Sequence, residues 1–378
     1  MELVAYHESI VKQPSPFREV ASFVTVLAVI LTAGSCGWSA AASGPVVEVS
    51  AWLPTTWDFE NAWPSFVTNA SRLACVSPVW YWLEPNGGVL ARVTDGKSGE
   101  VVGPVEDDVR AVCWRSGTRL MPLISNSQPG RSFDPEMTSR VLNTPLLRTS
   151  HVRALVTLVT AHGYDGIEID YELMKGGDRA AFTAFMTELS AALHARGKLL
   201  AGAFHPKVAE PGDDWGPSAQ DWEALGKLVD SFRIMTYDHH YSGGPAGPLA
   251  ALPWFKEVLA FAVARVPKEK ILMGIPTYGY DWTGSRTGKA TDVVPRTAPE
   301  LAKKKGARIQ RDPDSGEPHF SYLENTDEHF VWYEDAACLP AKLAAVRAAG
   351  VAGIAVWRLG SEEPAFWQAL DAPAPDSR

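Results

Sequence analysis

Eight short apolar runs, each rich in β-branched or aromatic residues, recur along the chain and alternate with longer stretches of helical periodicity. Near-continuous apolar strands separated by helices are typical of a parallel sheet that helices cover. Eight such units in about 330 residues fit a closed barrel better than an open doubly wound sheet. We therefore predict an α/β fold, a (β/α)8 TIM barrel. Its expected strands are residues 46–54, 73–83, 119–125, 166–172, 199–206, 232–238, 271–280 and 353–359.

Three of the intervening segments carry strong helix signals. Residues 149–163, 178–197 and 336–350 have apolar residues at helical spacing, and each segment ends on a glycine. No G-x-G-x-x-G follows the first expected strand, and no G-K-[ST] is present, so nucleotide binding has no support in the sequence.

The interval between the seventh and eighth expected strands is longer than one helix requires. Residues 283–335 contain a basic stretch at 303–305, a turn-rich stretch at 312–316 and two strand-like pieces, HFSYL and HFVWYED. A long disordered loop is the alternative, which the aromatic content disfavours. We predict a small α+β insertion on the C-terminal face of a barrel domain that spans residues 43–378.

The first 42 residues resemble an export leader. An uncharged apolar run at 20–31 follows Lys12 and Arg18, and it has the length of a signal-peptide core rather than of a membrane span. Cleavage after Ala42 would release the protein, whereas cleavage before Cys36 would expose that thiol for a lipid anchor, as in bacterial lipoproteins. Both routes remain open, and we expect an exported protein, either secreted or held at the cell envelope.

The net charge and the cysteine positions limit which ligands and cross-links we expect. The net charge of −9 argues against a nucleic-acid partner, because neutralising phosphates requires clustered Lys and Arg. Cys75 and Cys113 could pair in an oxidising compartment, while Cys338 stands alone. No C-x-x-C is present and no His lies at ligand spacing with a Cys, so we expect no metal site. Nothing in the sequence sets an oligomeric state, and a monomer is the working expectation.

The fourth expected strand carries acidic residues at alternate positions. Glu168, Asp170 and Glu172 stand at i, i+2 and i+4, so all three project from one face of a strand. Like charges in a low dielectric raise one another's pKa, so at least one carboxyl should keep its proton near neutral pH. A glycosidase needs such a protonated acid, and Glu172 stands at the C-terminal, catalytic end of the strand. The alternative is a solvated edge strand. The opposite face carries Ile167, Ile169 and Tyr171.

The stretch DGIEIDYE, residues 165–172, resembles the strand-four signature of glycoside hydrolase family 18, the chitinase-like family. The similarity extends to residues 235–250, 271–282 and 350–360, and within the family it is closest to the bacterial cell-wall and spore-cortex lytic N-acetylglucosaminidase type. The resemblance implies a (β/α)8 barrel that retains anomeric configuration, with the acetamido oxygen of the substrate as nucleophile. It implies no cofactor.

The resemblance also implies a role for each site residue. Glu172 would protonate the glycosidic oxygen and later activate water, Asp170 would bind the acetamido N–H, and Tyr237 would donate to the acetamido oxygen. Glu168 stands where the family usually has Asp, and its longer side chain changes the reach to Asp170. The implied substrate-binding residues are Trp357 as the floor beneath the sugar, Met235, Asp238, Tyr278 and Glu168.

We expect an exported glycosidase that cleaves β-1,4 bonds beside N-acetylglucosamine in a glycan, with peptidoglycan favoured over chitin. A catalytically silent glycan-binding lectin on the same barrel is the alternative, but such relatives typically lack the terminal acid that Glu172 supplies here. A scaffold protein is a third class, because a fold alone does not fix a function. Exo and endo action both remain open.

Overall fold

We describe the protein from a computed structural model over residues 47–55, 57–91, 104–127, 133–284 and 290–372. The expected leader, with Cys36, lies outside these residues. No helix within them combines the length and the apolarity that crossing a bilayer requires.

Eight parallel strand positions, called staves below, form a closed barrel, as the sequence predicted. The first strand pairs in parallel with both the second and the last, and these two pairings close the ring. The third stave is broken into two pieces around Pro122, which has no N–H to donate to the ladder. The barrel strands are β1 (Glu48–Leu53), β2 (Cys75–Leu83), β4 (Arg119–Leu120) with β5 (Leu123–Ser125), β6 (Gly166–Asp170), β7 (Leu199–Phe204), β8 (Ser231–Ile234), β9 (Ile271–Pro276) and β15 (Gly353–Trp357). A short strand, β3 (Val89–Ala91), runs antiparallel to β2.

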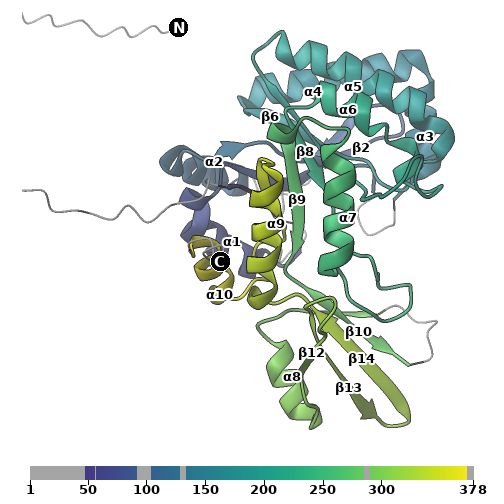
Figure 1. Ribbon diagram of the computed structural model, residues 1–378. Helices are drawn as coiled ribbons and strands as arrows, with labels where there is room; N and C mark the ends of the chain where they lie inside the picture. Colours follow the sequence, from purple (N-terminus) through teal and green to yellow (C-terminus); the bar gives the residue numbers. More distant parts are fainter. Residues whose placement is uncertain (1–46, 56, 92–103, 128–132, 285–289, 373–378) are drawn as a thin grey trace, which may run out of the picture. The chain divides into compact units, whose positions relative to one another are not determined.

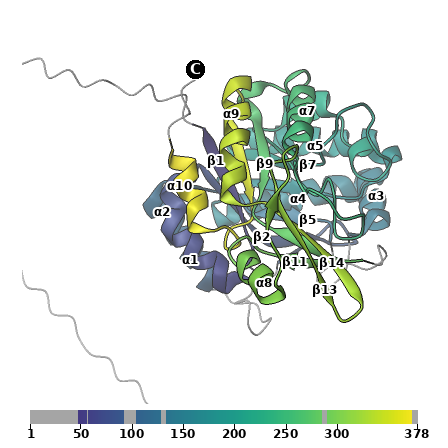
Figure 2. The same ribbon diagram turned by 60° about the horizontal axis from the view of Figure 1, so that its bottom comes forward.

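Helices surround the strands, which lie at the centre in Figure 2. They are α1 (Phe59–Asn69), α2 (Pro104–Ser116), α3 (Pro135–Asn143), α4 (Pro145–His162), α5 (Arg179–His194), α6 (Trp222–Leu228), α7 (Leu252–Val263), α9 (Leu339–Ala349) and α10 (Pro364–Asp371). The three helices expected from periodicity are α4, α5 and α9. Gly163 ends α4 in the left-handed conformation, with φ 67°, which glycine adopts without steric cost.

The main apolar core lies between the barrel and the helices. Ile167, Ile169 and Tyr171 belong to it, so the apolar face of the fourth strand packs under helices as expected. Full burial of a large apolar side chain stabilises the fold by about 1.5–3 kcal/mol. The alternation of residues along β6 therefore separates a helix-facing apolar side from a barrel-facing acidic side.

The insertion between the seventh and eighth staves is a five-stranded antiparallel sheet with one helix, seen at the lower end of Figure 1. It begins earlier than predicted. The expected strand 271–280 divides at Thr277, whose N–H and hydroxyl donate to the carbonyl oxygens of Trp357 and Arg358. The chain then leaves the barrel and pairs antiparallel with the insertion. The insertion comprises β10 (Gly279–Thr283), β11 (Thr291–Val293), α8 (Ala298–Lys305), β12 (Gln310–Arg311), β13 (Pro318–Glu324) and β14 (Asp327–Tyr333).

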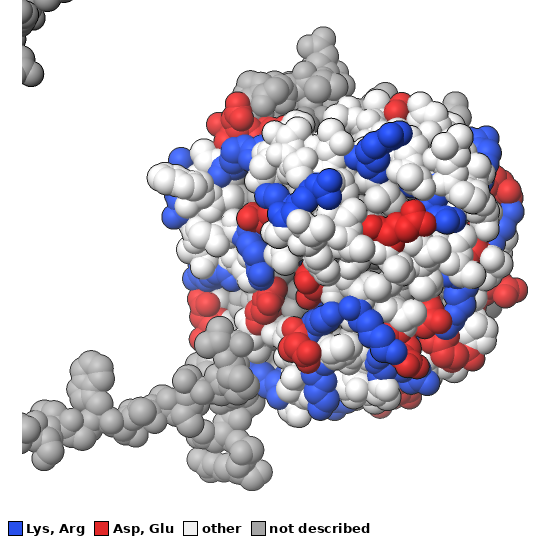
Figure 3. Space-filling model, turned by 90° about the horizontal axis from the view of Figure 1, so that it is seen from above, with Lys and Arg blue, Asp and Glu red and all other residues white. Residues whose placement is uncertain are grey.

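The pairing of Cys75 with Cys113 proposed from the sequence is wrong. Both thiols are free and buried, as is that of Cys338. Cys75 instead accepts a hydrogen bond from the guanidinium of Arg233. Lys and Arg side chains mix with Asp and Glu side chains on the face shown in Figure 3, which is seen from above the α4 and α5 end of Figure 1. Arg148 of α4 and Glu188 of α5 form an ion pair at 2.8 Å between these two helices.

Candidate active site

Two pockets meet at the carboxyl ends of the barrel strands. They share the side chains of Glu172, Met235, Tyr237 and Asp238. The small pocket, of about 190 Å³, is also lined by Trp52, Asp170 and Trp357. The large pocket, of about 1050 Å³, is also lined by His205, Trp215, Tyr241, His239 and Trp254. Six of the eight predicted site residues therefore converge on the small pocket.

A buried asparagine holds the backbone at Glu172. Asn126, which directly follows β5, accepts from the Glu172 N–H at 2.9 Å and donates to the Glu172 carbonyl at 2.8 Å. Glu172 lies two residues beyond the end of β6, and the next residue, Leu173, has a positive φ of 51°. The predicted strand thus ends at Asp170. The chain turns there because Asn126 replaces the missing strand partner, and this turn brings Glu172 into both pockets.

The environment of Glu172 favours its protonated form. Burial, followed by the nearby charge of Asp238, raises the pKa of Glu172 to about 8. The side chain is still 23% exposed, so it reaches the pocket. A carboxyl group in this state can give a proton to a leaving group at neutral pH.

Asp170 is the last residue of β6, and it lines the small pocket but not the large one. Burial, and then the charges of Glu172 and Glu168, raise the pKa of Asp170 well above its usual value. Its Oδ1 atom is buried and has no hydrogen-bond partner. Buried polar atoms are normally paired, so an unpaired one in a pocket is a candidate contact for a ligand.

Glu168 does not line either pocket, which corrects its prediction as a substrate-binding residue. It is fully buried inside the barrel, where its Oε2 accepts from Arg233 Nη1 at 2.6 Å and its Oε1 accepts from Trp52 Nε1 at 3.1 Å. Burial raises the pKa of Glu168, while the Arg233 charge opposes that rise. The longer side chain of Glu thus reaches a cation across the barrel, and the row of three carboxylates is partly neutralised at its deep end.

The segment after β8 supplies a second part of the pocket lining. The predicted strand 232–238 ends at Ile234, and Met235, Tyr237 and Asp238 follow it. Burial, then the charges of Glu172 and Asp170, raise the pKa of Tyr237 well above its usual value, so its hydroxyl stays a donor. Asp238 has a left-handed φ of 57°.

Two tyrosines fix the carboxyl group of Asp238. Tyr278 and Tyr280 donate to its Oδ1 at 2.5 and 3.0 Å. Burial is the largest influence on the pKa of Asp238 and raises it, while the two tyrosines oppose the rise. Tyr278 is not among the residues that line these two pockets, and its hydroxyl supports Asp238, which lines both.

Trp357 closes the other side of the small pocket at the end of β15. Its ring meets Trp52 edge-on at 5.7 Å between centroids, and Trp57 lies 6.4 Å away on another side. Aromatic faces suit the apolar faces of sugar rings. The Trp357–Arg358 peptide bond is cis.

The sequence analysis did not single out Asn126, Arg233, Trp52 or His205 as site residues. Asn126 and His205 each directly follow a barrel strand, the position from which catalytic-face residues come, so this position was an available signal. Arg233 and Trp52 lie within strands, and only the closed barrel brings them to Glu168.

Over the part of the chain that the structure describes, no group of three or more His, Cys, Asp or Glu side chains could hold a metal ion. The pocket combines a protonated acid, a second carboxyl with an unpaired oxygen, a tyrosine hydroxyl and an aromatic wall. This set can protonate a leaving oxygen and stabilise a developing positive charge on a sugar.

A model of the family "Glycosyl hydrolases family 18" matches residues 116–362. An uncharacterized glycosylase of Bacillus subtilis, YvbX, is 31% identical over 72% of this chain and 80% of its own length. The chain spans 64% of the length of the cortical fragment-lytic enzymes of Bacillus that it also matches.

Solved structures show the same architecture. The spore cortex-lytic enzyme SleL of Bacillus cereus superposes with a TM-score of 0.78 at 25% identity, covering 87% of this chain and 74% of that one. A chitinase of Chromobacterium violaceum superposes with a TM-score of 0.77 at 27% identity, covering 86% of this chain and 98% of that one.

Proposed function

The chain belongs to glycosyl hydrolase family 18 and is a glycosidase, and from this premise we propose that it cleaves β-1,4 bonds beside N-acetylglucosamine by substrate assistance. The observation that carries the proposal is the small pocket. It is lined both by Asp170, whose Oδ1 has no hydrogen-bond partner, and by Glu172, whose pKa is raised. In the proposed reaction Glu172 protonates the glycosidic oxygen. The substrate's acetamido oxygen then attacks the anomeric carbon.

Asp170 and Tyr237 orient the acetamido group in this proposal. Asp170 accepts from its N–H, and in its ionised form it stabilises the positive charge that develops on the sugar, because opposite charges attract strongly in a buried site. Tyr237 donates to the acetamido oxygen. Trp357 supports the face of the same sugar. When the leaving group departs, the Glu172 carboxylate takes a proton from water, which opens the intermediate.

We favour peptidoglycan over chitin as the glycan. Relatives named as cortex-lytic enzymes support this choice, while the similarity to a chitinase keeps chitin as the second substrate. The large pocket extends the site beyond Glu172 and offers room of about 1050 Å³ for the leaving side of a glycan. That volume is at the upper end of ordinary ligand pockets, about 300–1,000 Å³.

The test compares two substrates. Purified protein is incubated with peptidoglycan sacculi and with chito-oligosaccharides, and the released products are identified by mass spectrometry. Saccharides that end in N-acetylglucosamine from sacculi support the peptidoglycan proposal. Release from chito-oligosaccharides alone would make the protein a chitinase. Binding without any release would favour the lectin alternative.

We also propose that residues 1–42 direct export, with either cleavage after Ala42 or a lipid anchor at Cys36. The apolar run at 20–31 and the small residues that follow it support this proposal. Mass spectrometry of the mature N-terminus decides between the routes. A terminus at Ser43 indicates release, an acylated Cys36 indicates an anchor, and an intact Met1 on protein kept inside the cell contradicts export.

A further inference from the structure

The Nε2 atom of His205 lies near Glu172 and has no hydrogen-bond partner. His205 directly follows β7, and its Nε2 is 3.8 Å from Glu172 Oε2, beyond hydrogen-bond distance. That Nε2 atom is buried and makes no hydrogen bond. Burial lowers the pKa of His205 to about 4, so the imidazole is neutral at neutral pH. A small movement of either side chain would join the two groups.

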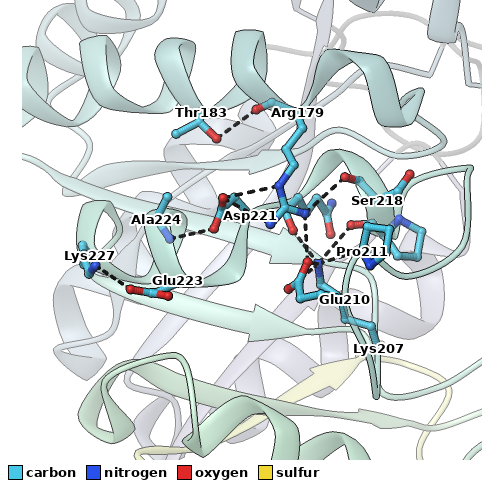
Figure 4. Close-up of polar contacts among 12 residues, drawn as sticks. Arg179, Thr183, Lys207, Glu210, Pro211, Ser218, Asp221, Glu223, Ala224 and Lys227 are labelled. Carbon is cyan, nitrogen blue, oxygen red and sulfur yellow. Dashed lines mark hydrogen bonds and ion pairs between the residues drawn. The ribbon is translucent and has the colours of Figure 1, made fainter.

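The loop that carries His205 is held from its far side. Lys207 is almost fully buried, and its Nζ donates to the carbonyl oxygens of Gln220 at 2.6 Å and Pro217 at 3.2 Å. It also pairs with Glu210 at 3.1 Å. Figure 4 shows Lys207 beside Glu210 and Pro211, with which it makes contacts inside the loop, residues 205–221. The Lys207 charge is thus engaged within the loop and not directed at Glu172.

Arg179 extends this network to the helix behind the loop. As the first residue of α5, it pairs with Glu210 at 2.9 Å and with Asp221 at 3.1 Å. These ion pairs tie both arms of the loop to α5. The loop is therefore built as a fixed support rather than as an open turn.

The same loop sets the place of the imidazole. The backbone N–H of His205 donates to Gln220 Oε1 at 2.9 Å. Gly216 lies against the ring, and a Cβ there would approach His205 Nε2 to 2.4 Å. Gly216 also has a φ of 92°, which other residues rarely adopt. The ring is thus confined between Gly216 and Glu172.

We propose that His205 is a positioning residue for the proton cycle of Glu172, an inference that rests on the proposed function. Its Nε2–H donates a hydrogen bond to the Glu172 carboxylate after Glu172 has given its proton to the leaving oxygen. The bond stabilises the carboxylate and holds it in place until it accepts a proton from water. Hydrogen bonds to a charged acceptor are roughly twice as strong as neutral ones, so the bond favours the charged state.

The other groups that face Glu172 act in the opposite sense. Asp170 from β6 and Asp238 after β8 are acidic, and Tyr237 faces Glu172 as a neutral hydroxyl. His205 Nε2 lies 3.8 Å from Glu172 Oε2 and, as a hydrogen-bond donor, can offset the repulsion between the carboxylates. Without it, the proton would be harder to release from Glu172.

The test is the titration of Glu172 in His205→Leu. We expect the midpoint of the Glu172 titration to rise by about 0.5–1 pH unit, the effect of one lost hydrogen bond. The midpoint is followed by carboxyl-carbon NMR of protein labelled at Glu, with Glu172→Gln to assign the signal. The alkaline limb of kcat/KM should move by the same amount. His205→Gln keeps a hydrogen-bond donor, so its Glu172 midpoint should return most of the way to the wild-type value.

His194→Leu, which removes an exposed imidazole from α5, is the matched control and should leave the Glu172 midpoint unchanged. Gly216→Ala, which pushes the ring away from its place, gives a second route if His205→Leu does not fold. An unchanged Glu172 midpoint in His205→Leu overturns the proposal. If His205→Leu does not fold, an unchanged midpoint in Gly216→Ala overturns it. A loss of hydrolysis through a higher KM does not alter this conclusion. The NMR titration needs no turnover, so it decides this point even if the proposed substrates are not cleaved.

Discussion

At the scale of single residues, the surroundings of Glu172 set its protonation state. Its carboxyl group is buried beside Asp238, and both influences favour the neutral acid. Glu172→Gln keeps the size and the hydrogen-bonding groups of the side chain but cannot give up a proton. We expect hydrolysis to fall by about 10²–10⁴-fold, the usual contribution of a general acid, while glycan binding is retained. Initial rates and equilibrium binding measure the two effects.

A surface carboxyl group provides the control for that substitution. Glu223→Gln removes an exposed acid on α6 whose side chain is 70% exposed, and its activity should match the wild type. Unchanged turnover in Glu172→Gln would contradict the assignment of the acid.

The pH dependence of the reaction follows from the same group. The acid must be protonated to act, and the pKa of Glu172 is raised to about 8. Activity should therefore persist at neutral pH and fall as the pH rises through about 8. The alkaline limb of kcat/KM, which reports the free enzyme, measures this value. A limb close to the ordinary glutamate pKa of about 4.3 would show that the burial seen here does not control Glu172.

At the scale of elements, the end of α4 depends on a conformation that only glycine adopts freely. Gly163 has φ 67°, and a Cβ at this position would meet no atom within 4 Å. Gly163→Ala should therefore destabilise the protein by about 1 kcal/mol through backbone strain alone. Denaturant unfolding measures the change.

Gly177→Ala is the matched control for that strain. A Cβ at Gly177 also meets nothing within 4 Å, and its φ is not positive. The substitution should be neutral or slightly stabilising. Equal losses in the two variants would mean that φ at Gly163 is not the cause.

At the scale of the whole molecule, a buried ion pair crosses the inside of the barrel. Arg233 from β8 holds Glu168 from β6 and also donates to Ser77 from β2 at 2.7 Å. Arg233→Met would leave the Glu168 charge buried and unpaired. We expect a loss of about 3–5 kcal/mol in the free energy of unfolding, measured with urea.

The double variant Glu168→Met with Arg233→Met tests the reason for that loss. It removes both charges and should be more stable than Arg233→Met alone, because no unpaired charge remains. If the single and double variants lose the same free energy of unfolding, then the pair stabilises the fold through the volume that its side chains fill and not through their charges.

The sequence by itself determined the barrel, its eight staves and the helix-facing side of β6. Periodicity is a local property, so alternation along residues 166–170 reports which side meets apolar neighbours. The insertion was also visible as an interval too long for one helix. Alternation along the strand brought the acidic residues to notice and the resemblance added their partners, and six of the eight predicted site residues share the small pocket.

Only the tertiary structure decided what those side chains meet. Glu168 reaches Arg233, 65 residues further along the chain, because the barrel closes around both. Tyr278 supports Asp238 because the chain leaves the barrel at Thr277. His205 approaches Glu172 because a braced loop confines its ring. Contacts between distant segments depend on closure, register and loop geometry, and no local pattern in the sequence encodes them.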